Sequence, residues 1–427
     1  MVEPRRLPPL LGRVMRAYRT RLTARGQYLF WTILLVGTLG LDTHRNQVFK
    51  LFAVLAGIGF IAALFAFLPR PRVRFDCALP TRVTALTPTT ARARIVPTGG
   101  FGPRDLCFAL PPPHRAGDRI RFTPSRTYFE AKRDEPVELT AQIEAMRRGR
   151  YLLRAPEVRG TDPLRLALTR EHGLAEQILL VYPRFYSMED FIVPLGRRYQ
   201  PGGIPLASNT GDAIEFVGTR EYREGDPIKH IHWRSFARRG KPVVKEYQEE
   251  YFCRIAVILD TFLASKPRAG EERAFEAAVS LTASIADFFS RGEYIVDILA
   301  AGPDIYEVSA GRSLAYLENI LDVLACLEPC PQPPFQTISP VLFDKLAQIT
   351  SVVAVLLDWD DEREQFLQRV KALGTAVRVM LVHAGETHKS WRQVGEELGE
   401  VTLMTPEDVE RALATAQGGT IADRSTI

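Results

Sequence analysis

The sequence predicts a multi-domain protein with an N-terminal transmembrane helical hairpin, a small antiparallel β-sandwich and a C-terminal α/β domain of Rossmann-like layout. Two uncharged hydrophobic runs predict the hairpin, short segments rich in β-formers between Pro and Gly residues predict the sandwich, and alternating strands and helices predict the α/β domain. We expect a basic arm and the hairpin in residues 1–70, the sandwich in 71–183, a connecting segment in 184–250, the α/β domain in 251–416 and a tail in 417–427.

Composition and cysteine content are those of an ordinary globular protein of two or three domains. The chain has 427 residues, of which 46% are hydrophobic and 25% charged, and a formal net charge of +5. Its five cysteines are Cys77, Cys107, Cys253, Cys326 and Cys330. Cys326 and Cys330 have no Cys or His pair to complete a zinc site, so we expect free thiols in a reducing compartment.

The hydrophobic runs cover residues 26–41 and 51–68. The first would be about 24 Å long as a helix, just short of a typical membrane span, and Gly57 and Gly59 in the second would let a neighbouring helix approach. A cleaved signal peptide and a buried soluble hairpin are the alternatives. The sequence lacks the good cleavage site that a signal peptide needs, and it lacks the polar face that a buried soluble hairpin would show. Arginines flank both outer ends of the pair, which places both ends in the cytoplasm by the positive-inside rule. We therefore expect residues 26–68 to contact lipid and the remaining body to be cytoplasmic.

Residues 71–183 carry short runs of β-branched and aromatic residues with a turn signal about every ten residues. His, Cys and carboxylate side chains do not cluster here, so we expect a scaffold or docking role for this part.

Strands and helices alternate after residue 251, which predicts an open parallel sheet with helices on both faces. The strands are expected in residues 254–260, 294–300, 351–358 and 376–383, and the clearest helices in 272–291, 362–373 and 406–416.

The segment most informative about identity lies between the sandwich and the α/β domain. Its residues of interest, which we take as the candidate signature and interaction site, are Arg220, Glu221, Tyr222, Gly225, Asp226, Ile231, His232, Trp233, Arg238 and Glu246. Asp226-Pro227 predicts a helix start, Gly240 a helix end, and the alternation after Val243 a half-exposed strand.

The side chains of this segment leave several interpretations open. His230 and His232 are two residues apart and cannot share a metal on a helix, so a packed, hydrogen-bonded His232 is expected. Trp233 is expected to be buried where the segment clamps the α/β domain to the sandwich. The basic cluster around Arg238 is either a solvated face, a docking patch for an acidic surface or phosphate, or part of an internal ion-pair network.

These motifs, Arg220-Glu221-Tyr222, Gly225-Asp226, Ile231-His232-Trp233 and Ala237-Arg238, resemble the signature of the domain of unknown function 58 family. The resemblance implies a bacterial inner-membrane, multi-pass protein with a von Willebrand factor A-like domain, often encoded beside a MoxR-type AAA+ ATPase. Phe236 replaces a serine of the family pattern, and Leu164 replaces a phenylalanine in the turn that begins at Asp162.

Von Willebrand factor A-like domains bind a divalent cation through Asp-x-Ser-x-Ser at the end of the first strand, and Mg²⁺ requires such oxygen ligands. This chain has Asp260, but Phe262 and Ala264 stand at the two serine positions. Asp358, Asp360 and Asp361 follow a later strand and are the remaining nearby carboxylates. We expect a degenerate site at Asp260, with no metal and no cofactor.

Two classes of function follow. The first is a non-catalytic, membrane-tethered scaffold or adaptor that binds a protein partner, with a MoxR-type ATPase or a cell-envelope assembly factor implied by the resemblance. The second is a divalent-metal-dependent hydrolase at the Asp260 edge of the sheet. Nucleic-acid binding is not expected, because acidic residues interrupt the basic surface.

Overall fold

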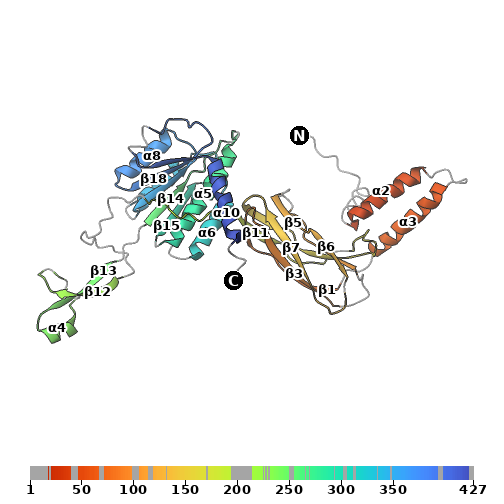
Figure 1. Cartoon of the computed structure of the whole chain (residues 1–427), viewed down its shortest axis with the longest axis horizontal. Coiled ribbons are helices and arrows are strands. Elements are labelled where there is room, and N and C mark those ends of the chain that lie inside the picture. Colours follow the sequence, from red (N-terminus) through yellow and green to blue (C-terminus); the bar gives the residue numbers. More distant parts are fainter. Residues whose placement is uncertain are drawn as a thin grey trace. The chain divides into compact units, whose positions relative to one another are not determined.

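The computed structural model consists of two compact units, Met1–Pro183 and Arg184–Ile427, each described here by itself (Figure 1). The described residues are 18, 21–39, 47–66, 72–98, 105–113, 119–130, 132–169, 172–193, 214–249 except 225, 227, 229 and 230, and 254–422 except 265, 269, 293, 302–304, 311–313, 334, 347–348 and 393–397.

The first unit begins with two hydrophobic helices, α2 (Ala24–Leu39) and α3 (Gln47–Ala66). They pack against each other at small residues, since a Cβ on Gly59 would lie 2.9 Å from Ile33 and a Cβ on Gly37 would lie 2.9 Å from Phe52. The expected close approach at Gly59 is confirmed. At Gly57 nothing lies within 4 Å, so the expectation is wrong for that residue.

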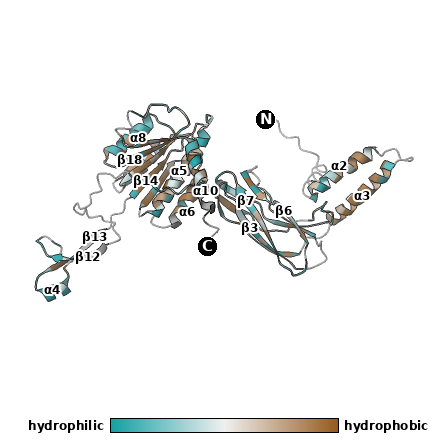
Figure 2. Ribbon diagram, in the orientation of Figure 1, coloured by the Kyte–Doolittle hydropathy of each residue, from teal (hydrophilic) through white to brown (hydrophobic). Residues whose placement is uncertain are grey.

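One of these helices has the length and composition of a membrane span. Residues Gln47–Phe65 of α3 meet that description, while α2 has only 16 residues. Figure 2 shows both helices as mainly hydrophobic, and large apolar side chains point outward from them, with Phe60 72% and Trp31 58% exposed. The described residues thus contain one candidate span, and the second span stays a prediction.

The start of α2 is bonded to a turn of the same unit. Thr23 donates its backbone N–H to the Leu166 carbonyl at 3.0 Å and its hydroxyl to the Arg165 carbonyl at 2.6 Å. The buried carboxylate of Asp162 organises that turn by accepting the backbone N–H groups of Leu166 and Ala167 at 2.8 and 2.6 Å. The motif that begins at Asp162 therefore supports the helix pair.

The rest of this unit is β-rich. Two four-stranded sheets and a three-stranded sheet share one apolar core. Their strand orders are β1-β3-β7-β5, β10-β9-β4-β6 and β2-β11-β8. The strands are β1 (Val73–Ala78), β2 (Arg82–Thr84), β3 (Thr89–Pro97), β4 (Asp105–Ala109), β5 (Ile120–Thr123), β6 (Arg126–Glu130), β7 (Val137–Ala145), β8 (Gly149–Leu153), β9 (Glu157–Thr161), β10 (His172–Gly173) and β11 (Gln177–Tyr182). Alternate residues of β1 and β3 are buried, as expected for strands with one face on a core. The expectation of a wholly antiparallel arrangement is wrong for one pair, because β11 and β2 run parallel.

The second unit contains a six-stranded sheet in the order β16-β15-β14-β17-β18-β19. The strands are β14 (Arg254–Leu259), β15 (Ile295–Ala301), β16 (Ile305–Ala310), β17 (Ser351–Leu356), β18 (Ala376–Val382) and β19 (Val401–Met404), and the helices are α5 (Glu271–Arg291), α6 (Leu314–Cys326), α7 (Phe335–Lys345), α8 (Asp361–Ala372) and α10 (Pro406–Ala422). The predicted mixed α/β part is confirmed. The sheet is not purely parallel, because β16 turns back antiparallel to β15 at the edge. The elements β16, α7 and β19 were not predicted from the sequence, and Pro340 inside α7 helps to explain the missed helix.

The central strands of this sheet are buried on both faces, which explains their unbroken apolar runs. Ala256 and Ile258 of β14 belong to the core formed with α7 and α8. The intervening residues of β14 lie on the opposite face, where α5 packs. In Figure 2 the central strands of the sheet are coloured mainly hydrophobic and α8 mainly hydrophilic.

An irregular segment, residues 184–193, is fastened along α5. Tyr186 donates its N–H to the Ser284 hydroxyl at 3.0 Å, and Arg291 donates to the Met188 carbonyl at 3.0 Å. The Phe191 ring packs edge-on against Phe289, with centroids 5.6 Å apart. These contacts hold the segment against α5 through both polar and aromatic side chains.

Candidate functional site

Asp260 lies directly after β14, at the carboxyl end of the central strands, and its side chain is completely buried. Its Oδ2 accepts two hydrogen bonds from Arg363, from Nε at 2.8 Å and Nη2 at 2.7 Å. The backbone N–H groups of Leu357 and Phe262 complete its shell at 3.1 and 3.0 Å. Both carboxylate oxygens are therefore satisfied by protein donors.

Arg363 reaches Asp260 from the first turn of α8, and its side chain is 6% exposed. Asp360 caps α8 by accepting the Arg363 N–H at 2.9 Å and also pairs with the Arg363 guanidinium. The guanidinium lies between two rings, 5.8 Å from the centroid of Phe262 and 5.6 Å from that of Phe335. Burial disfavours the charge, but Asp260 and Asp360 outweigh burial and raise the Arg363 pKa above its ordinary value.

This arrangement gives the degenerate motif after Asp260 a structural role. Phe262, at a position where the family resemblance expects a ligand oxygen, instead offers its ring to the guanidinium. Arg363 thus supplies the positive charge that Asp260 needs in a buried site. Arg363 was not predicted as a site residue, because an arginine in the first turn of a charged helix carries no sequence signal that it points inward.

The other carboxylates at this edge are also engaged. Asp358 accepts the His388 N–H at 3.0 Å and the Trp359 N–H at 2.8 Å, and it contacts the His388 ring. Burial alone would raise the Asp358 pKa, but these bonds from His388 and Trp359 lower it. Asp361 pairs with Lys389 at 2.7 Å. Among the described residues, no three His, Cys, Asp or Glu side chains are grouped so as to hold a metal ion.

A cleft of about 390 Å³ opens at this edge of the sheet. Ligands of open α/β sheets commonly bind at such an edge, outside the carboxyl ends of the strands. Its lining mixes Phe262 and Ala264 with the charged side chains of Lys266, Arg268 and Asp358. The cleft has the character of a mixed polar and apolar contact surface, with Arg363 at its base.

The signature residues form a second site, which we call the signature arm (residues 214–249). It is an antiparallel pair of β12 (Ile214–Glu221) and β13 (Val243–Glu249), with helix α4 (Trp233–Arg239) between them. The backbone N–H of Tyr222 donates to the Pro242 carbonyl at 3.0 Å, and the backbone N–H of His232 donates to the Val243 carbonyl at 2.7 Å. Val243 and Val244 are buried, so the arm has a small apolar centre of its own.

An ion pair holds the loop before α4. Arg220 donates Nη1 and Nη2 to the two oxygens of Asp226 at 2.7 and 2.8 Å, and Asp226 also accepts the Arg223 N–H at 2.8 Å. These bonds, with that from Arg220 first, lower the Asp226 pKa to about 2. The signature motif thus brings Arg220 and Asp226 together as a bidentate ion pair.

The helix of the arm differs from its prediction in where it begins. It starts at Trp233, not after Asp226-Pro227, and its N-cap is His232. Asp226 does not act as a cap because its carboxylate is bound to Arg220. The His232 ring lies 2.6 Å from the Ser235 hydroxyl, which confirms the expected hydrogen-bonded histidine. Gly240 ends the helix with φ 66°, a left-handed conformation that favours glycine and confirms the predicted terminus.

The prediction that Trp233 is buried is wrong. Its side chain is 60% exposed, and α4 has no buried residue. The Trp233 ring meets Phe236 edge to face with centroids 6.1 Å apart, so Phe236 supports it from the next turn. The replacement of the family serine by Phe236 therefore enlarges an exposed aromatic surface.

The remaining signature residues fall in different places. Ile231 bridges to Val244, Glu221 pairs with Val243 in the strand ladder, and Arg238 is exposed. Gly225 lies outside the described residues, as does the side chain of Glu246. The signature is thus mostly one local structure, organised around Arg220, Asp226 and His232.

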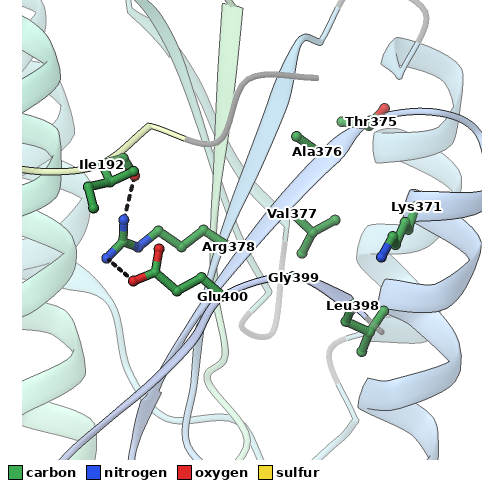
Figure 3. Close-up of a pocket in the computed structure, with 9 residues that line it drawn as sticks. All are labelled: Ile192, Lys371, Thr375, Ala376, Val377, Arg378, Leu398, Gly399 and Glu400. Atoms are coloured by element: carbon green, nitrogen blue, oxygen red, sulfur yellow. Dashed lines mark hydrogen bonds and ion pairs between the residues drawn. The ribbon is translucent and has the colours of Figure 1, made fainter. Parts of the chain in front are cut away.

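Figure 3 shows a third feature, a hollow of about 280 Å³ beside the start of β18. The Arg378 guanidinium points to the Ile192 carbonyl, at 2.5 Å, and to Glu400, at 3.4 Å. It also lies 4.6 Å from the Phe191 centroid. Lys371 lies on the other side of Val377 in this view, so the two cations do not converge. Arg378 fastens the 184–193 segment to the sheet.

The comparison with protein families identifies the region that holds both sites. The family model described as protein of unknown function DUF58 matches residues 218–411. These residues are similar to the DUF58 family, and we call them the DUF58 region. The DUF58 region begins within β12 and ends within α10, so it contains nearly all of the signature arm and the whole six-stranded sheet.

The chain is also similar to a curated protein, the uncharacterized protein YeaD of Bacillus subtilis (strain 168). It is 27% identical over 151 residues, which is 35% of this chain. The match likewise spans 35% of the length of YeaD, so it concerns about a third of each protein.

Two solved structures are similar to about a quarter of the chain. Both are of a CARDB domain from Pyrococcus furiosus, one a crystal structure in complex with di-metal ions and one a solution structure. The identities are 13% and 12%, the coverage is 27% of this chain and 91% or 97% of the solved domains, and the TM-scores are 0.19 and 0.18. At these scores neither match informs the function of the DUF58 region.

Proposed function

We propose that this protein is a non-catalytic, membrane-tethered adaptor that binds a protein partner through its α/β unit and signature arm. The observation that carries the proposal is the exposed face of α4, where Trp233 and Phe236 lie beside arginines and nothing in the helix is buried. Exposed large aromatics next to arginines are typical of the residues that dominate protein interfaces. The resemblance to the DUF58 family suggests a MoxR-type AAA+ ATPase or a cell-envelope assembly factor as the partner.

The site at Asp260 supports a binding role over a catalytic one. The α/β unit is proposed to be von Willebrand factor A-like, with Arg363 in the place of the cation. Oδ2 of Asp260 accepts three hydrogen bonds from Arg363 and the Leu357 N–H, and Oδ1 accepts one from the Phe262 N–H, so protein donors already engage both oxygens. The alternative, a divalent-metal-dependent hydrolase at this edge, would require Arg363 to leave Asp260.

The tether is proposed to be a two-helix hairpin in the bacterial inner membrane, with the body in the cytoplasm. Outward apolar side chains on both α2 and α3, and arginines on both outer flanks of the pair, support this topology. A fluorescent reporter fused after Ile427 should be active, whereas a reporter that works only in the periplasm should be inactive there. The reverse result would contradict the topology.

The binding role is tested by co-purification. Full-length protein is solubilised from native membranes in mild detergent, and its associated proteins are quantified by mass spectrometry against a matched bait that ends at Pro183. We expect a near-stoichiometric partner with the full chain alone. Recovery of the same proteins with both baits, or of none with either, would overturn the proposal.

The hydrolase alternative is tested by calorimetric titration of the full-length protein with Mg²⁺ and Mn²⁺. We expect affinity no tighter than roughly millimolar, because Arg363 holds Asp260 and two ligand positions are apolar. Micromolar affinity would favour the enzyme instead.

A further inference from the structure

One stretch of the signature arm, residues 227–245, contains basic residues and no acidic ones. Between Asp226 and Glu246 the chain has Lys229, Arg234, Arg238, Arg239, Lys241 and Lys245 and no acidic residue. Arg234, Arg238, Arg239 and Lys241 are exposed, and within the described part of the chain none of the four pairs with a carboxylate. Asp226, the acidic residue that immediately precedes this stretch, is paired with Arg220.

The apolar part of the same face is small and defined. Trp233 and Phe236 are one turn apart and in ring contact, and Ile228 is 68% exposed just before the helix. The short helix α4 therefore carries both an exposed aromatic pair and exposed arginines, residue types that are enriched in interface hot spots.

The frame beneath this face is rigid. Arg220 and Asp226 form a two-bonded ion pair, His232 contacts Ser235, and the His232 N–H is bonded to β13. A face held in one conformation before binding loses little conformational entropy when a partner docks.

We propose that the signature arm recognises an acidic protein surface with an apolar recess for Trp233, and that this contact is how the adaptor selects its partner. This inference rests on the proposed function and specifies the surface and the chemistry of the partner. A lipid surface fits less well, because membrane-surface helices are usually long and carry an extended apolar face, whereas α4 has seven residues and two aromatics.

The test is site-specific photo-crosslinking of the full-length protein in native membranes. A photoreactive amino acid replaces Ala237, which is exposed on α4 and is not part of the proposed contact, or Ala264, which is exposed at the cleft of the sheet. Two variants are compared in each background: Arg238→Glu with Arg239→Glu, and the charge-preserving Arg238→Lys with Arg239→Lys.

We expect a protein cross-link from position 237, to a peptide with more Asp and Glu than Lys and Arg. The glutamate variant should reduce its yield at least about tenfold, and the lysine variant by no more than about threefold. Cross-linking to lipid, or a protein cross-link that survives charge reversal, would overturn the inference.

The outcomes also separate this inference from the proposed function. If the co-purified partner cross-links from position 264 and not from 237, the arm does not select the partner, yet the adaptor role stands. If neither position cross-links to a protein and co-purification finds none, both proposals fail.

Discussion

Arg363 donates two hydrogen bonds to a single oxygen of Asp260, from a helix that begins 101 positions further along the chain. This pair occupies the carboxyl edge of the central strands, where the family resemblance predicts a cation. Because both side chains are buried, their charges depend on each other. The negative charge of Asp260 at this edge of the sheet is thus balanced by Arg363 of the same chain.

Replacing Arg363 by methionine should destabilise the α/β unit by about 3–5 kcal/mol, because Asp260 would remain as a buried, unpaired carboxylate. Thermal unfolding of the full-length protein in detergent measures the loss. Arg369→Ala, an exposed position on the same helix, is the matched control and should change stability by no more than about 0.5 kcal/mol. Adding Asp260→Asn to Arg363→Met should restore part of the stability, and equal, additive losses would contradict the pairing.

Alanine substitution should lower the thermal stability at one tryptophan, Trp359, and leave it nearly unchanged at another, Trp233. Trp359 is completely buried, so Trp359→Ala should cost about 3–5 kcal/mol through the cavity that it leaves. That loss corresponds to roughly 6–20 °C in the midpoint of the α/β unit's thermal transition. Trp233→Ala removes an exposed ring, and its effect on the midpoint should be close to zero while partner recovery falls. A large drop in the midpoint for Trp233→Ala would return this residue to the structural role first expected from the sequence.

The Asp226 carboxyl should titrate at about pH 2 in the folded protein, below the ordinary value of 3.8, because Arg220 holds its charged form. A depressed pKa means that the ion pair stabilises the arm fully above pH 3.8, and that the contribution is lost as the pH falls through about 2. Carboxyl ¹³C chemical shifts of the labelled protein report this titration, with Asp226→Asn used to assign the signal. Arg220→Gln should move the midpoint up toward 3.8, and an unchanged midpoint in that variant would contradict the assigned cause.

Cys77 and Cys107 should resist alkylation in the native protein at pH 8. Both are buried, and burial, the largest cause for each, raises each thiol pKa to about 11, so the reactive thiolate is scarce. Peptide mapping after iodoacetamide treatment measures their labelling, and the same treatment in denaturant is the control. Rapid native labelling of either cysteine would show that the β-rich unit opens readily.

The four described cysteines are free, as expected from the sequence, and Cys253 lies outside the described residues.

The sequence predicted correctly those elements that are specified by neighbouring residues in the chain. The apolar run before Asp260, the stripe of α5 and the glycine at 240 each act through neighbouring residues, so their periodicity and backbone preference were sufficient. Elements with weak or interrupted signals were missed. Helix α7 contains Pro340, and the edge strand β19 has only four residues.

The sequence by itself determined that two oxygen ligands are absent after Asp260, that the stretch from residue 227 to 245 has basic side chains and no acidic ones, and that the first 68 residues hold two apolar runs. Only the tertiary structure decided what neutralises Asp260 and whether Trp233 is buried. The first outcome depends on a partner far away along the chain, and the second on how little the described residues cover α4, and neither leaves a period in the sequence. Arg363 and Arg369 lie in the same charged helix, but only the fold turns one of them toward a buried carboxylate and the other toward solvent.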